Sequence, residues 1–207
     1  ALVSVYHKEG IVPFVKQLRS YGVEIISTGG TLSALRAAGI PVTSVSDVTN
    51  FPEMLDGRVK TLHPLIHGGL LYRRTDRTHV KEARKHGIKP IDMVVVNLYP
   101  FTDVVQKKGV TEEEAIEHID IGGPTMLRSA AKNYESVAVV SDPRDYDTVA
   151  AALKKHNGTL PRALCKTLAA KVFALTGWYD SAIAHYLAPA EASFPETLTL
   201  SYTKVAP

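Results

Sequence analysis

The feature that most constrains the fold is the alternation of short apolar runs with segments of helical spacing. LVSV at 2–5 and VEII at 23–26 are predicted strands. The segment between them has apolar residues at helical intervals, namely Ile11, Phe14, Val15 and Leu18. A second predicted helix, about 31–38, ends at Gly39 and is followed by the strand candidate PVTSV. This alternation predicts an α/β fold with a doubly wound, mostly parallel sheet flanked by helices.

The middle of the chain continues the pattern after an irregular stretch, 47–75, in which Pro64 disfavours a helix. HVKEARKHG predicts a polar helix that closes at Gly87, and IDMVVVNLYPF is the most strand-like run of the chain. Thr111 and Glu114 form a capping-box pattern before AIEHI. A further helix is therefore expected there.

The last third of the chain is mostly helical. VAVVSDP predicts a last buried strand, and its Asp142-Pro143 pair suits the cap and first turn of a helix through about Lys155. Apolar residues then recur every three or four positions over 160–187. This spacing predicts either one long helix or two helices broken near Gly177.

Composition limits the class of function. Lys and Arg number 24 against 21 Asp and Glu, and the net charge of +3 does not indicate a nucleic-acid partner. The single cysteine, Cys165, excludes an internal disulfide and is expected to be buried on a helix. No apolar run approaches the roughly 18 residues of a membrane span, and no signal-peptide pattern precedes the first strand. We therefore expect a cytoplasmic protein that has no membrane partner.

STGGT, residues 27–31, is a candidate anion site. Glycines let the backbone approach a ligand, the hydroxyls of Ser27, Thr28 and Thr31 can donate, and a helix starting near Thr31 would present free N–H groups. A phosphate is the expected ligand, and a simple strand-to-helix turn with a Thr cap is the alternative. Since ligands bind at the carboxyl ends of parallel strands, STGGT, NLYPF and SDP are candidates for one rim.

The loop DGRVKTLHP and the end of the strongest strand carry further candidates. Arg58 can fork onto phosphate oxygens, Lys60 supplies a point charge, and Thr61 follows in the same loop. Asn97 and Tyr99 end the strand, where rigid support lets side chains reach a ligand. An exposed basic loop and a hydrogen-bonded strand-end turn are the structural alternatives.

Other familiar chemistries have little support. The sequence has neither G-x-x-x-x-G-K-[ST] nor G-x-G-x-x-G. His63 and His67 lie four apart, but Pro64 disfavours a helix there and no Glu takes the zincin position, so no metal site is predicted. Asp120 and Lys132 form a possible acid–base pair, although each alone would more often be a surface charge.

Five motifs together resemble a known family. SV-x-x-K-x-G, STGGT, FPEMLDGRVKTLHP, VVVNLYPF and IDIGGPTMLRSAAKN are similar, in order and spacing, to the IMP cyclohydrolase part of the bifunctional purine biosynthesis proteins. The resemblance covers 1–205. It implies a methylglyoxal-synthase-like domain over 1–187 and a connector, 188–207, toward an absent AICAR formyltransferase domain. The chain would then be a fragment or a single-domain form.

The reaction that this resemblance implies is closure of 5-formamidoimidazole-4-carboxamide ribotide to IMP with loss of water. The carboxamide nitrogen must attack the formyl carbon, a step helped by positioning and by stabilising the developing oxyanion. No redox or metal cofactor is needed for it. The enzyme would be a hydrolase of cyclic amidines that works in the ring-closing direction. The family also implies a homodimer.

Carried over by position, the resemblance implies a set that binds the ribotide, with its phosphate on the Gly-rich turn: Lys8, Thr28, Gly29, Gly30, Thr31, Arg58, Val59, Lys60 and Thr61. The base portion would be contacted by Asn97, Asp120 and Ile121. Asp120 would orient the carboxamide or remove its proton. Lys60 and Tyr99 would polarise the formyl oxygen, and Lys132 would donate or accept a proton.

One motif departs from the family, which usually reads SVSDKTG where this chain reads SVYHKEG. Tyr6, His7 and Glu9 replace Ser, Asp and Thr of that pattern, and Glu9 would repel a phosphate that it touched.

Two other functions share the fold class. A phosphate-sensing regulatory domain would not need the acid–base set, and methylglyoxal synthase is not supported by the RVKTLHP and IDIGGPT blocks.

Overall fold

The computed structural model describes residues 1–188 and 197–202. Within these residues a five-stranded sheet forms the centre, with all neighbouring strands parallel. In spatial order the strands are β3 (Thr43–Ser44), β2 (Ile26–Ser27), β1 (Leu2–Val5), β4 (Met93–Asn97) and β5 (Ala138–Val140). Val5 pairs with Asn97, so β1 and β4 end side by side. The predicted α/β class is confirmed.

Helices follow nearly every strand. They are α1 (Ile11–Ser20), α2 (Gly29–Ala37), α3 (Val45–Thr49), α4 (Pro64–Leu71), α5 (Arg77–Lys85), α6 (Phe101–Val105), α7 (Glu112–Glu117), α8 (Gly122–Lys132), α9 (Tyr146–Lys155) and α10 (Arg162–Leu187), with 3-10 turns η1 (Leu55–Gly57) and η2 (Pro143–Asp145). None of the helices in the described part of the chain combines the length and hydropathy that a membrane span requires.

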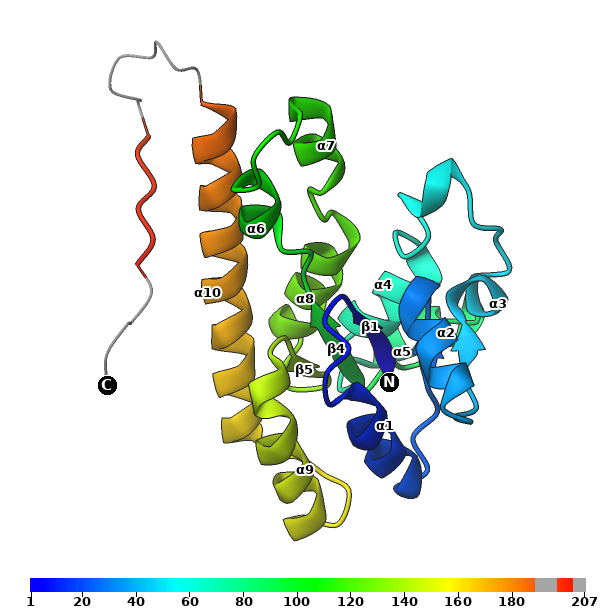
Figure 1. Ribbon diagram of the computed structural model, residues 1–207. Coiled ribbons are helices and arrows are strands. Elements are labelled where there is room, and N and C mark those ends of the chain that lie inside the picture. Colours follow the sequence, from blue (N-terminus) through cyan, green and yellow to red (C-terminus); the bar gives the residue numbers. More distant parts are fainter. Residues whose placement is uncertain (189–196, 203–207) are drawn as a thin grey trace.

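The helices pack in two groups around the sheet (Figure 1). α8 lies on β4 and β5 and contacts both α4 and α10. α1 packs with α9, where the rings of Phe14 and Tyr146 stack with centroids 4.6 Å apart. All five residues of β4 are buried, as expected for a strand covered on both faces.

The long helix α10 runs along one flank of the molecule (Figure 1). It is continuous from Arg162 to Leu187, which resolves the question of a break near Gly177. Cys165 is buried on it, as predicted, and burial raises the pKa of its thiol. The predicted connector, 188–207, lies largely outside the described residues. Of its described part, Thr199 accepts a hydrogen bond from Ser181 Oγ at 3.2 Å.

The stretch 47–75 is more ordered than the sequence predicted. α4 begins at Pro64, so the expectation that this proline disfavours a helix was wrong. At the first helical position proline removes only an N–H that has no partner in the helix, and its fixed φ suits the first turn. His63 caps this helix, since its Nδ1 accepts from Leu65 N–H at 3.2 Å.

Two other boundaries moved for local reasons. β2 comprises only Ile26 and Ser27, which pair with Leu2 and Val3 of β1. The first three residues of VEII precede this strand. PVTSV gives a strand of two residues, Thr43–Ser44, and Val45 already starts α3. Ser44 and Asp47 form a reciprocal capping box there, which the strand interpretation had overlooked.

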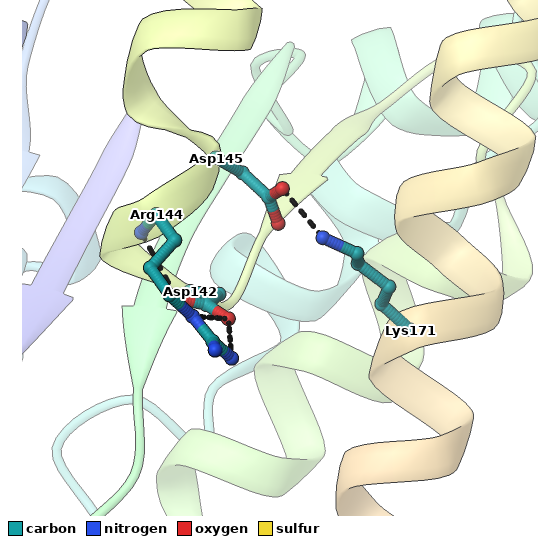
Figure 2. Close-up of polar contacts among 4 residues, drawn as sticks. All are labelled: Asp142, Arg144, Asp145 and Lys171. Carbon is teal, nitrogen blue, oxygen red and sulfur yellow. Dashed lines mark hydrogen bonds and ion pairs between the residues drawn. The ribbon is translucent and has the colours of Figure 1, made fainter. Parts of the chain in front are cut away.

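An ion pair ties α10 to the turn after β5 (Figure 2). Lys171 Nζ donates to Asp145 Oδ1 at 2.5 Å, and the Asp145 side chain is only 12% exposed while that of Lys171 is 47% exposed. Beside it Asp142 caps η2 and is held by the Arg144 guanidinium, which lowers the pKa of the Asp142 carboxyl. The cluster therefore fixes how α10 meets the sheet.

The asymmetric burial of this pair predicts unequal effects of its two truncations. Lys171→Met leaves a buried carboxylate without its cation and is expected to lower the free energy of unfolding by about 2 kcal/mol. Asp145→Asn leaves a half-exposed lysine that water can solvate, so the loss should stay below about 1 kcal/mol. Urea unfolding of both variants measures the difference, and a larger loss in Asp145→Asn would contradict the role given to Lys171.

Candidate active site

The Gly-rich turn stands at the carboxyl edge of the sheet. α2 begins at Gly29, two residues earlier than predicted, and Thr28 precedes it in extended conformation. Gly29 has φ +54°, a conformation that a residue with a side chain adopts only with strain. The N-terminus of α2 therefore lies at the end of β2, where its first N–H groups can meet an anion.

The hydroxyls of the turn do not all face a ligand. Ser27 Oγ donates to Val3 O at 2.7 Å. Thr31 Oγ1 both donates to Val5 O and accepts from Val5 N–H, each at 2.9 Å. Both side chains therefore fasten the turn to β1, and the expectation that they donate to a ligand does not fit this structure. Thr28 is 8% exposed, and no partner for its hydroxyl is found among the described residues.

Two lysines lie against the backbone of this turn. A Cβ atom placed on Gly29 would be 3.4 Å from Lys60 Nζ, and one placed on Gly30 would be 3.7 Å from Lys8 Nζ. Lys60 is also paired with Glu53 at 3.3 Å, and Lys8 Nζ donates to Tyr6 O at 3.2 Å. Two ammonium groups beside a helix N-terminus are an arrangement that favours an anion, so this turn stays a candidate phosphate site.

The loop that carries Lys60 also reaches the N-terminus of α8. Thr61 is buried, and its Oγ1 lies 2.8 Å from the place where a Cβ of Gly122 would be. Val59 is partly buried in the same loop. Arg58 instead extends to an exposed ion pair with Glu117 of α7. Lys60 and Thr61 are thus brought to the site, while Arg58 is engaged elsewhere in this structure.

Asn97 joins the ends of the two central strands. Its Oδ1 accepts from Tyr6 N–H at 2.6 Å and from His7 N–H at 3.0 Å, and its Nδ2 donates to His7 O at 3.0 Å. The side chain was predicted to contact the base, but its amide already makes three internal hydrogen bonds. It therefore holds the loop that leads from β1 to Lys8.

Asp120 lies just ahead of α8 with a perturbed carboxyl group. Its Oδ1 accepts from Gly123 N–H at 2.8 Å, and its own N–H donates to Tyr179 Oη at 2.8 Å. Burial raises the pKa of this carboxyl, against smaller lowering by the N–H groups of Gly123 and Tyr99. Ile121, beside it, is 57% exposed. A carboxyl group of raised pKa at a strand edge suits proton transfer.

Lys132 is a second predicted residue, after Arg58, that the structure does not bring to this edge. It is exposed in the last turn of α8. This helix has 11 residues, so its two ends lie about 15 Å apart. The acid–base pair expected between Asp120 and Lys132 is therefore not formed within one chain.

His67 is a site neighbour that the sequence analysis considered only as a metal ligand. From α4 its Nδ1 lies 3.0 Å from Ser129 Oγ on α8. Burial lowers the pKa of its imidazole, and the carbonyl of Thr61 acts weakly in the opposite sense. His67 therefore lies between α8 and the loop that carries Thr61. In the described part of the chain no group of three His, Cys, Asp or Glu side chains could hold a metal ion.

A cavity of about 470 Å³ adjoins Tyr99 on the side away from the Gly-rich turn. It lies over the ends of β4 and β5 and below α10, and residues such as His7, Ser141 and Trp178 line it. Tyr179, which binds the Asp120 N–H, lines it as well. Ser141, Asp142 and Pro143 of the predicted SDP segment line this cavity, whereas no residue of the Gly-rich turn does.

Comparison with known proteins agrees with this fold. The MGS-like domain model matches residues 10–125, and the chain belongs to that family. The AICARFT/IMPCHase bienzyme model matches residues 130–207. The predicted family resemblance is confirmed.

Individual relatives cover nearly the whole chain. The bifunctional purine biosynthesis proteins PurH of Listeria monocytogenes serotype 4b (strain CLIP80459) and Magnetococcus marinus are 60% and 55% identical to it, over 99% of its length. The chain spans 40% of the length of each of these two relatives. A crystal structure of ForH, 37% identical, matches with a TM-score of 0.82 over 89% of this chain and 94% of that one.

The raised pKa of Asp120 predicts a conflict between stability and function. A carboxyl whose folded pKa lies above its ordinary value of 3.8 destabilises the folded state once pH rises past that value. Asp120→Asn keeps the acceptor for Gly123 N–H and removes the charge. We expect its Tm to exceed that of the unmodified chain at pH 7 and to show no such gain at pH 3.

Asp142→Asn is the matched control, because its carboxyl has the opposite shift. Arg144 lowers the pKa of Asp142, so its charge stabilises the fold above the ordinary value of 3.8 and this contribution fades as pH falls. Asp142→Asn should therefore lose stability at pH 7 and approach the unmodified chain in acid. A lower Tm of Asp120→Asn at pH 7 would contradict the burial assigned to Asp120.

Proposed function

We propose that this chain is an IMP cyclohydrolase, which closes 5-formamidoimidazole-4-carboxamide ribotide to IMP and releases water. The observation that carries the proposal is the pairing of a Gly-rich turn flanked by two lysines with a partly buried carboxyl of raised pKa. Lys8 and Lys60 lie on the turn, and Asp120 lies across the same edge beyond Thr61. The similarity of this chain, over nearly its whole length, to the bifunctional purine biosynthesis proteins PurH supports the choice of substrate.

The phosphate of the ribotide would occupy the N-terminus of α2. Its oxygens would accept from the backbone N–H groups of Gly29, Gly30 and Thr31 and from the two lysines. Lys60 would exchange its contact with Glu53 for the ligand, and Arg58 would have to leave Glu117 to take part. Thr28 offers the hydroxyl of the turn, and Val59 and Thr61 shape the opposite wall.

The heterocycle would then lie toward α8, where Asp120 and Ile121 can contact it. Asp120 orients the carboxamide and takes a proton from its nitrogen as that nitrogen attacks the formyl carbon. The new C–N bond forms as the formyl C=O becomes a hydroxyl group, and this oxygen then leaves as water with one proton from the carboxamide nitrogen and one from the formamido N–H, helped by Lys60 and Tyr99. A raised pKa makes Asp120 a stronger base for this step. Asn97 supports the site by fixing the loop after β1.

A spectrophotometric assay of IMP formation from the ribotide tests the function. The unmodified chain should accelerate closure, and Lys60→Met should lower kcat/KM by about 100-fold, the usual effect of removing one donor to a developing charge. Lys81→Met, on the exposed face of α5, is the matched control and should retain full activity.

Other outcomes of this assay separate the two rival functions. Tight binding of IMP without acceleration would contradict catalysis and indicate a phosphate-sensing domain. Elimination of phosphate from a triose phosphate would indicate a methylglyoxal synthase.

The remaining parts of the proposal concern the assembly. We place the enzyme in the cytoplasm as a homodimer, and we assign 188–207 to a connector toward the part of the PurH relatives that this chain does not span. Because Lys132 lies far from Asp120 within one chain, it would exchange a proton at the site of the second copy.

Complementation tests the role of Lys132. Lys132→Met and Asp120→Asn should each be inactive, yet a mixture of the two should recover part of the activity, because a hybrid dimer contains one site with both groups. Sedimentation measures whether the dimer forms. Full turnover by Lys132→Met alone would remove this lysine from the mechanism.

A further inference from the structure

Two exposed aromatic rings stand together at the rim of the site. Tyr6 follows β1 and Tyr99 follows β4, and their side chains are 44% and 49% exposed. The ring centroids lie 5.1 Å apart, with the planes tilted by 53°. The strands that carry them are neighbours in the sheet, so the contact belongs to the fold.

The side-chain amide of Asn97 holds the backbone that carries Tyr6, and the Tyr6 ring contacts that of Tyr99. Asn97 Oδ1 accepts a hydrogen bond from the Tyr6 N–H at 2.6 Å. The same side-chain amide also bonds both the N–H and the carbonyl oxygen of His7. The rings of His7 and Tyr6 are nearly perpendicular, with centroids 5.0 Å apart. Because a ligand would meet rings that are already placed, it would spend little entropy in ordering them.

The two rings bridge the two ends of the proposed ribotide site. At one end Lys8 Nζ donates to Tyr6 O and lies against Gly30, where the phosphate is expected. At the other end the Tyr99 N–H faces the carboxyl of Asp120, where the base reacts. The heterocycle of a ribotide that spans these ends must pass beside Tyr6 and Tyr99.

We propose that Tyr6 and Tyr99 form an aromatic wall that takes one face of the heterocycle of the bound ribotide. The inference rests on the proposed function and adds Tyr6 as a residue that determines specificity for an aromatic base. Tyr6 belongs to SVYHKEG, the segment in which this chain departs from the SVSDKTG that the family resemblance implies. The extra ring thus gives this chain a stacking surface in the segment that departs from the family.

Calorimetric titration with two probes, IMP and ribose 5-phosphate, tests the wall, since only IMP has a base. Tyr6→Leu should bind IMP about tenfold more weakly, as expected for loss of one base–aromatic stack, and ribose 5-phosphate unchanged. Tyr6→Phe keeps the ring and should bind IMP within about twofold of the unmodified chain. Tyr21→Leu replaces an exposed tyrosine at the far end of α1 and is the matched control.

The possible results separate the wall from the function. Equal weakening of both probes in Tyr6→Leu, with an unchanged Tm, would overturn the wall and assign Tyr6 to the phosphate end. Unchanged binding of IMP by this variant would also overturn it, while leaving the cyclohydrolase assay untouched. An unmodified chain that bound ribose 5-phosphate but not IMP would contradict the proposed function itself.

Discussion

The side-chain amide of Asn97 is the contact on which the candidate site depends. The chain first builds β1, β2 and β3 toward one edge of the sheet and then crosses to β4 and β5 on the other side, so the strand order reverses between β1 and β4. Such a reversal opens a crevice at the carboxyl ends of the strands. Asn97 spans it with three hydrogen bonds to Tyr6 and His7. One buried amide thereby sets where Lys8 and the aromatic rings stand.

The second organising element is the loop that leads from η1 to α4. Its Lys60 lies on the N-terminus of α2, and its Thr61 lies on the N-terminus of α8. Two helix N-termini that belong to distant parts of the sequence thus face one loop. Anionic groups are favoured near the N-termini of both α2 and α8. The partly buried carboxyl of Asp120 keeps its raised pKa in this setting because desolvation outweighs the two N–H groups that face it. The site therefore retains a locally unfavourable charge, as functional sites often do.

The sequence predicted which segments form the candidate site better than it predicted the contacts of each side chain. STGGT and the loop with Lys60 were singled out because glycines, hydroxyls and basic side chains in loops can bind an anion, and the structure brings these two segments together. Asn97 and Thr31 were interpreted as ligand contacts, whereas their polar atoms are used within the fold. His67 and Tyr179 were missed as supporting residues, since their partners lie on other elements, distant in sequence. Hydrogen-bond partners across the fold leave no signal in local spacing.

By itself the sequence determined the alternation of strands and helices, the caps at Thr111 and Asp142, and the buried faces, because these follow from periodicity and local hydrogen bonding. It also determined that basic and hydroxyl side chains would follow the strands. Only the tertiary structure decided that α4 begins at Pro64, that α10 passes Gly177 without a break, and that Lys132 lies at the far end of α8 from Asp120. Those features depend on which elements pack together and in which direction each helix runs, and such long-range contacts are set by the whole fold.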